Sequence, residues 1–197
     1  MKALLLSIKP EHVINILNGK KTLELRKRVP KGFKGWVYCY VTKGKPILWD
    51  IEDVSGIDFY GQRYLIRDEN LTMSDLIYTG KKLNGTIPFR FWFDEYNIIY
   101  YTIADYQRPT WDGYYVGEEL LRKLCLTELQ VNNYGKGKDL YAWHIKNLDP
   151  FYEPMQLSNF KKEEYAVMPN GVWPCYQPIT KAPQSYMYVY VKEAQDD

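Results

Sequence analysis

The N-terminal part of the chain alternates apolar runs with short polar breaks, and this pattern predicts the order strand, helix, strand, strand. Residues 3–8 form an apolar run typical of a buried strand. Pro10 suits the first turn of a helix, because its missing N–H would have no partner there, and Val13, Ile14 and Leu17 then share one face.

Gly19 fits the left-handed position that ends a helix. In residues 22–28, Leu23 and Leu25 alternate with polar side chains, which predicts a second strand with one buried face. Residues 36–41, WVYCYV, are rich in strand-forming residues and predict a third. The polar face of the second strand is the best candidate site in the sequence.

The middle of the chain gives weaker signals. Residues 43–85 mix short apolar runs with turn residues and acids, and predict only a short helix near residues 74–79. Residues 87–106 predict one long strand or two consecutive strands, with Pro88 at a strand start or an edge. Helical spacing predicts two helical segments in residues 117–135, with Thr127 as a cap and Gly135 at the end.

Residues 140–148 and 185–191 predict two further strands. Six of the eleven prolines fall between residues 150 and 183, so that span is expected to be a long irregular excursion. Many strands and few helices indicate an α+β, mainly β protein: a small closed or half-closed barrel with helices at its mouth. We expect a single domain over residues 1–192, with an insertion at about 43–85 and a frayed tail over 193–197.

The basic residues are concentrated at one end. The formal net charge is +2, yet residues 1–36 hold nine Lys or Arg against two acids, Glu11 and Glu24, so the remainder is net acidic. Such asymmetry suits a polyanionic partner, because phosphate neutralisation dominates nucleic-acid affinity. A solvated lysine-rich face is the alternative.

The number and spacing of the cysteines and histidines argue against a disulfide-stabilised protein and against a zinc site. Cys39, Cys125 and Cys175 are far apart and odd in number, which indicates no disulfide framework, and His12 and His144 lack metal-ligand spacing. No apolar run reaches the ~20 residues that span a bilayer. The sequence therefore predicts a cytoplasmic protein with no metal, no cofactor and no membrane partner.

The polar face of residues 22–28 carries specific chemistry. Arg26 can donate a bidentate pair to a phosphate or a base edge, and Lys21 can supply a point charge. Glu24 between cations is expected to stay ionised and to accept from an amine or orient a water, which with Lys21 makes a hydrolytic pair. The alternative is a surface ion pair worth ~0–1 kcal/mol.

Three segments resemble a known family: SIKPEHVINILNGKKTLELRKRVP, YAWHIKNLDPFYEPMQLSNF and APQSYMYVYV. Together they resemble an ASCH domain of the PUA-like superfamily, in the long version common in bacterial viruses and mobile elements, with GxKTxExR as the discriminating motif. The resemblance implies a PUA-like barrel and an RNA-binding or nucleotide-processing module, in the cytoplasm of a bacterial or virus-infected bacterial cell.

The resemblance also implies where the site lies. The family's cleft is lined by the GxKxxExR residues, here Lys21, Glu24 and Arg26, with Lys9 beside it and Ser185 from the last strand. One short branch hydrolyses acetylcytidine with a motif Lys and a Thr two residues before the motif Arg, but Glu24 occupies that Thr position here. A ribonuclease activity proposed in the wider family has no identifying motif in this chain.

Aromatic residues make up 16% of the chain, and most are expected to fill the core, although some suit base stacking. His144 is a candidate general base, but a lone histidine in an apolar strand is more often a hydrogen-bonded structural residue. Lys21 and Glu24 are the candidate catalytic residues. The predicted ligand-binding set is Lys9, Lys20, Lys21, Thr22, Glu24, Arg26, Trp36, Ser185 and Tyr186.

Three functional hypotheses follow. The first is a module that binds single-stranded RNA, a nucleotide or a modified nucleoside. The second is a hydrolase that acts on a nucleoside amide or on RNA. The third is a viral protein that binds a host protein's basic surface through the acidic residues 50–75.

Overall fold

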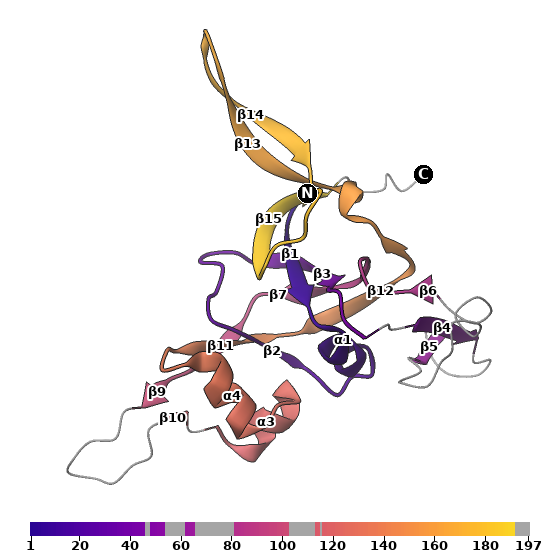
Figure 1. The fold of residues 1–197 in the computed structure, drawn as a ribbon, viewed down its shortest axis with the longest axis vertical. Coiled ribbons are helices and arrows are strands. Elements are labelled where there is room, and N and C mark those ends of the chain that lie inside the picture. The colour runs from indigo at the N-terminus through magenta and orange to yellow at the C-terminus, as the bar shows by residue number, and fades with distance from the viewer. Residues whose placement is uncertain (46–47, 54–61, 66–80, 103–112, 115, 192–197) are drawn as a thin grey trace. The chain divides into compact units, whose positions relative to one another are not determined.

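The structure, a computed structural model, describes residues 1–45, 48–53, 62–65, 81–102, 113–114 and 116–191 (Figure 1). The chain forms two compact units. The first unit comprises Met1–Ile14, Trp36–Arg90 and Asp149–Asp197, and the second comprises Asn15–Gly35 and Phe91–Leu148. The protein is mainly β with few helices, as the sequence predicts.

A mixed seven-stranded sheet dominates the first unit. Its order is β12 (Lys146–Met155), β7 (Ile87–Phe93), β3 (Gly35–Val41), β1 (Lys2–Ile8), β15 (Tyr186–Val191), β13 (Phe160–Met168) and β14 (Gly171–Pro178). β1 pairs parallel with β3 and antiparallel with β15. β1 thus has a strand on each side, and its apolar run is buried on both faces.

The sheet is not closed into a barrel, which corrects the expected architecture. β12 and β14 stand at the two ends of the strand order. Pro174 and Pro178 lie in β14, and proline has no N–H to donate to a further strand. The local sequence therefore favours an edge at β14.

Residues 150–183 are also not an irregular excursion. They contain most of β12, a 3-10 turn at Leu157–Asn159, and β13 and β14, which pair antiparallel from Lys161 opposite Pro178 to Met168 opposite Gly171 (Figure 1). Prolines on an edge strand do not interrupt the pairing with its one neighbour. The number of prolines therefore predicts an interruption of regular structure, whereas in the structure these prolines lie in an edge strand.

The core of the first unit gathers apolar side chains from several strands. Phe160 lies edge-on to Tyr38, with ring centroids 5.0 Å apart. The buried members are Ala3, Leu5, Tyr38, Ile87, Phe160, Ile179, Val189 and Val191.

Short strands occupy the stretch where the sequence predicts little. β4 (Leu48–Asp53) pairs antiparallel with β5 (Gln62–Leu65) and with β6 (Lys81–Lys82). The predicted helix near residues 74–79 lies outside the described residues.

The second unit is built on a three-stranded antiparallel sheet with the order β2 (Leu23–Arg26), β11 (Leu140–His144) and β8 (Tyr96–Ile99). It also contains α3 (Glu118–Leu124), α4 (Glu128–Gly135) and the pair β9 (Tyr101–Thr102) and β10 (Gly113–Tyr114). Its core is a separate cluster: Leu23, Leu25, Ile99, Tyr114, Val116, Leu124, Val131, Leu140 and Ala142.

The predicted helix signals are largely confirmed. α1 spans Pro10–Leu17, and Gly19 follows it with φ +70°. Thr127 caps α4 with a capping box, in which its side chain accepts from Gln130 N and its own N–H donates to the Gln130 side chain. The left-handed residue after α4 is Lys136, at φ 52°, and not Gly135.

Gly135 is needed for a different reason. A Cβ added to it would lie 1.9 Å from the Tyr114 hydroxyl oxygen. That hydroxyl donates to Lys138 O and accepts from Lys138 N at 3.1 Å, so it has little freedom to move. Only a residue without a side chain lets α4 approach Tyr114 this closely.

We therefore predict that Gly135→Ala destabilises the protein by about 2 kcal/mol or more, because the added methyl overpacks against Tyr114. Urea unfolding of the variant measures the loss. Gly117→Ala is the matched control, since a Cβ at Gly117 meets nothing within 4 Å. Equal midpoints for the two variants would contradict the close approach.

Candidate functional site

The second unit buries most of the charged row that the sequence places on an accessible strand face. Lys21, Glu24 and Arg26 are only 2%, 4% and 8% exposed. The predicted alternation is present, but Leu23 and Leu25 on the other side of β2 are buried as well. The row is therefore part of the interior of this structure.

A continuous ionic network explains how these charges tolerate burial. Lys21 Nζ lies 3.4 Å from Glu24 Oε2, and Arg26 Nη2 lies 2.9 Å from Glu24 Oε1. Each oxygen of the Glu24 carboxylate thus faces a cation, which a buried charge requires to offset its lost hydration. The negative charge of Glu24 is compensated internally.

The same segment caps the C-terminus of α3. Lys21 Nζ donates to Leu124 O at 2.7 Å, and Thr22 N donates to Lys123 O at 3.0 Å. The last carbonyls of a helix have no partner within the helix and carry its partial negative charge. The start of β2 and the end of α3 therefore satisfy each other.

Tyr134 of α4 lies close to this network. Lys27 Nζ stands 5.0 Å from the centre of its ring. Burial is the main factor that raises the pKa of the Tyr134 hydroxyl; the nearby Arg26 lowers this pKa and the nearby Glu24 raises it. Tyr134 is nevertheless 37% exposed.

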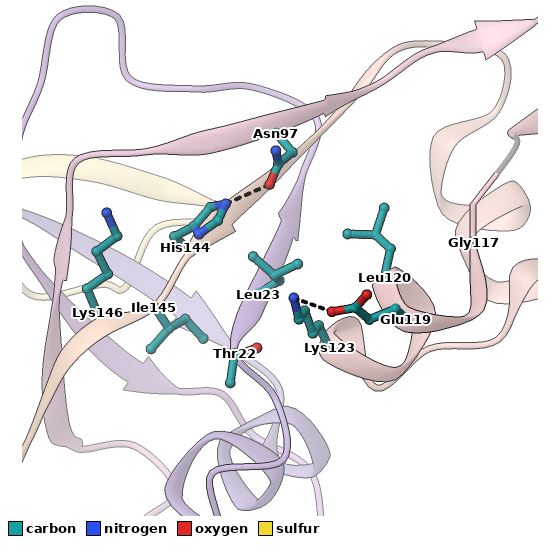
Figure 2. A pocket seen from close by; sticks show the side chains of 10 residues that line it. All are labelled: Thr22, Leu23, Asn97, Gly117, Glu119, Leu120, Lys123, His144, Ile145 and Lys146. Carbon is teal, nitrogen blue, oxygen red and sulfur yellow. Dashed lines mark hydrogen bonds and ion pairs between the residues drawn. The ribbon is translucent and has the colours of Figure 1, made fainter.

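A pocket of about 420 Å³ opens beside Thr22, which is exposed (Figure 2). This volume falls within the range of small-molecule sites, roughly 300–1,000 Å³. We call it the His144 pocket. Leu23, Leu120 and Ile145 give it an apolar part. The remaining lining residues are Thr22, Asn97, Gly117, Glu119, Lys123, His144 and Lys146.

His144 is held in place within this pocket. Its Nε2 lies 2.6 Å from Asn97 Oδ1 (Figure 2). Its Nδ1 lies 4.0 Å from Glu95 Oε2. An amide oxygen can only accept, so the Asn97 contact requires a proton on Nε2. The backbone also fixes the residue, because His144 N donates to Glu95 O at 3.0 Å.

Lys146 is paired with two carboxylates. Its Nζ lies 2.9 Å from Asp94 Oδ1 and 2.7 Å from Glu95 Oε2. The hydrogen bonds from Lys146 are the main cause of the lowered pKa values of Asp94 and Glu95. Conversely, the bonds to Glu95 and Asp94 raise the pKa of Lys146.

The second lysine of the pocket is also paired. Lys123 Nζ lies 2.7 Å from Glu119 Oε1, one helical turn away, and this contact lowers the pKa of Glu119 (Figure 2). Both lysines of the pocket are therefore compensated by acids. Such a lining suits an uncharged polar ligand better than an isolated phosphate.

Five further cations of the second unit lie close together in the sequence, within residues 20–34. Lys20, Lys27, Arg28, Lys31 and Lys34 are all exposed. None of the ion pairs formed within the described part of the chain involves them. We call these five residues the cationic segment.

Four predicted ligand-binding residues belong to the first unit. Lys9 is exposed and lies 3.9 Å from Glu11. The guanidinium of Arg90 lies 4.1 Å from the ring centre of Trp36, so a structural cation already contacts this aromatic ring. Ser185 O accepts from Ser7 N at 2.9 Å, and Tyr186 lies opposite Leu6 in the sheet. Their binding role stays a prediction.

The structure also adds residues that sequence reasoning missed: Asn97, Glu119, Lys123, Tyr134 and Lys146. Glu119 and Lys123 carry a readable signal, because acid and base four residues apart pair on a helix. Asn97 carries no such signal, since the pairing of β8 with β11 brings it close to His144 from a distant segment.

Among the described residues, no group of three or more His, Cys, Asp or Glu side chains is arranged to hold a metal ion. In the same part of the chain, no helix has the length and apolar character needed to cross a bilayer.

The chain matches no family model and no curated protein. Among solved structures it is similar to an ASCH protein from Zymomonas mobilis, with 15% identity and a TM-score of 0.49 over 94% of this chain and 86% of that one. A tyrosine-to-phenylalanine mutant of that protein gives 16% identity and a TM-score of 0.43, over 80% of this chain and 77% of that one.

The buried network leads to a stability prediction. Lys21→Met removes one cation from Glu24 and the cap from α3, so we expect a loss of about 2 kcal/mol. Urea unfolding measures it. Lys9→Met is the control and should change stability by less than about 0.5 kcal/mol, since its pair is exposed. Equal effects would refute a structural role for Lys21.

The His144 pocket leads to a titration prediction. Lys146→Met should raise the pKa of Glu95 and Asp94 toward ordinary values, because their main hydrogen-bond donor is lost. Both folded-state pKa values are lowered, so the stability they contribute is present above the unfolded pKa and is lost as pH falls through the folded one.

NMR titration of the carboxyl carbons measures these shifts. Lys123→Met is the matched control and should raise the pKa of Glu119 while leaving Glu95 unchanged. A Glu95 pKa that does not respond to Lys146→Met would contradict the pairing.

Proposed function

We propose that this protein binds single-stranded RNA through the cationic segment of its second unit. The observation that carries the proposal is the exposure of Lys20, Lys27, Arg28, Lys31 and Lys34, none of which is in an ion pair among the described residues. Lys and Arg that neutralise phosphates supply most of the sequence-independent affinity for nucleic acids. The GKKTLELR motif, which resembles that of ASCH domains, supports the same class of partner.

The buried network strengthens the electrostatic argument. Residues 15–35 contain seven cations and a single acid, Glu24. Because Glu24 is paired with Lys21 and Arg26 inside the protein, it does not offset the exposed cations. Burial of one ion pair network thus leaves the surface of this segment uniformly positive.

The His144 pocket complements the cationic segment. Its lysines are compensated, while Thr22 and Asn97 offer uncharged hydrogen-bonding groups next to apolar side chains. A ribose or a base fits this chemistry, whereas phosphates fit the cationic segment. The same pocket suits a free or modified nucleoside.

The hydrolase hypothesis stays a prediction, and the structure supports it less well than RNA binding. Lys21 and Glu24 are buried, and the Lys21 ammonium already donates to Leu124 O. A group that supports a helix end and a buried carboxylate is poorly placed to reach a substrate. The host-protein hypothesis rests on residues 50–75, most of which lie outside the described residues.

Binding of a labelled single-stranded RNA across a series of salt concentrations tests the proposal. Five phosphate contacts should give a slope of log K against log[salt] of about −3.5. Arg28→Gln combined with Lys31→Gln should flatten the slope by about 1.4, because two contacts are lost.

The matched control removes the same charge from the first unit: Lys43→Gln combined with Lys181→Gln, both exposed positions. This variant should keep the wild-type slope. No binding, or affinity independent of salt, would count decisively against an RNA-binding function. A control variant as weak as the test variant would instead indicate a nonspecific effect of net charge.

A further inference from the structure

A second pocket lies among the residues of the cationic segment. It measures about 410 Å³ and is lined by the loop between β2 and β3 together with Phe93, Asp94 and Tyr96. We propose that this aromatic pocket binds one unstacked base of a single-stranded RNA, whose neighbouring phosphates contact Lys31 and Lys34. The inference rests on the proposed RNA-binding function and assigns it a base-binding site.

The loop holds Phe33 in a fixed position at this pocket. Its ring is nearly parallel to that of Phe93, with an interplanar angle of 14° and centroids 6.4 Å apart. A Cβ on Gly35 would lie 3.0 Å from Phe33 Cζ, so the glycine leaves the room that this ring occupies. Phe33 N donates to Pro30 O at 3.2 Å, which closes the turn.

Tyr96 provides a second aromatic side chain. It is 40% exposed, and its contact with Tyr141 is edge-on, at 5.7 Å and 70°. Phe33 lines the pocket and is half-buried. Aromatic side chains with accessible surface are the groups on which unpaired bases stack.

The charged residues that line the aromatic pocket include more lysines than acids, as binding of a phosphate requires. Lys31 and Lys34 line it and are exposed. The one acid in its lining, Asp94, lies 2.9 Å from Lys146 Nζ, a cation that Glu95 also contacts, and Lys34 helps to lower the pKa of Asp94. Two lysines against one acid leave the lining of the aromatic pocket net positive. In the His144 pocket, by contrast, Lys123 and Lys146 are both held in ion pairs.

These features together favour a nucleotide within a single strand. Aromatic rings suit the flat base, and the two lysines suit the phosphates on either side. Bases in a duplex are already stacked and cannot enter such a pocket without unpairing. Single-stranded RNA should consequently bind more tightly than a duplex of the same sequence.

Phe33→Leu tests the proposal, because leucine keeps apolar contact with Phe93 but removes the ring. We expect affinity for single-stranded RNA to fall about 5-fold or more, with an unchanged salt slope since no charge is altered. The fluorescence of a 2-aminopurine base in the RNA should be quenched on binding to the wild-type protein, and quenched less on binding to the variant. Tyr152→Leu is the control, as it removes a 64% exposed aromatic of the first unit.

The outcomes are separable. Weaker binding with an unchanged slope, and loss of discrimination against duplex RNA, would support the aromatic pocket. Full affinity in the Phe33→Leu variant would overturn it and leave the proposed function intact. Absence of RNA binding by the wild type would overturn both. If thermal unfolding shows that Phe33→Leu is not folded, Tyr96→Leu replaces it with the same expected results.

Discussion

The ammonium group of Lys21 holds together the parts of the second unit that matter for function. It contacts the Glu24 carboxylate at the start of β2 and the last carbonyl of α3, two groups that would each be costly to bury alone. Arg26 completes the charge balance from the far side of Glu24. α3 and β2 also supply walls of the His144 pocket, so the contacts of Lys21 join two elements that line it.

Burial of the network has an electrostatic consequence at the surface. An exposed Glu24 would have neutralised part of the field of its basic neighbours, whereas a buried Glu24 bound to two cations does not. The five exposed cations of the cationic segment therefore act with one sign on a ligand. In this chain the same short segment supplies a structural ion network and the exposed cations of the proposed binding surface.

Local sequence signals predicted much of the fold, but they did not predict contacts between residues far apart in the chain. The Leu23/Leu25 alternation, Gly19 and the Thr127 cap depend on a few neighbouring residues, and the sequence alone revealed them. The burial of Lys21 depends on Leu124 O, 103 residues away, and no spacing rule indicates that contact. The open sheet and the β13–β14 hairpin were missed because prolines that break a central strand are tolerated at an edge.

The two pockets of the second unit differ in how far their lysines are paired with acids. In the His144 pocket, acids fix the lysines and leave neutral groups to face a ligand, so contacts there should vary little with salt. In the aromatic pocket, Lys31 and Lys34 are in no ion pair among the described residues and adjoin aromatic rings, so charge and stacking act on the same nucleotide. Phosphate contacts alone bind any polyanion, whereas stacking selects unpaired bases. The pairing of a cationic rim with an aromatic interior is thus what would give this module its preference for single strands.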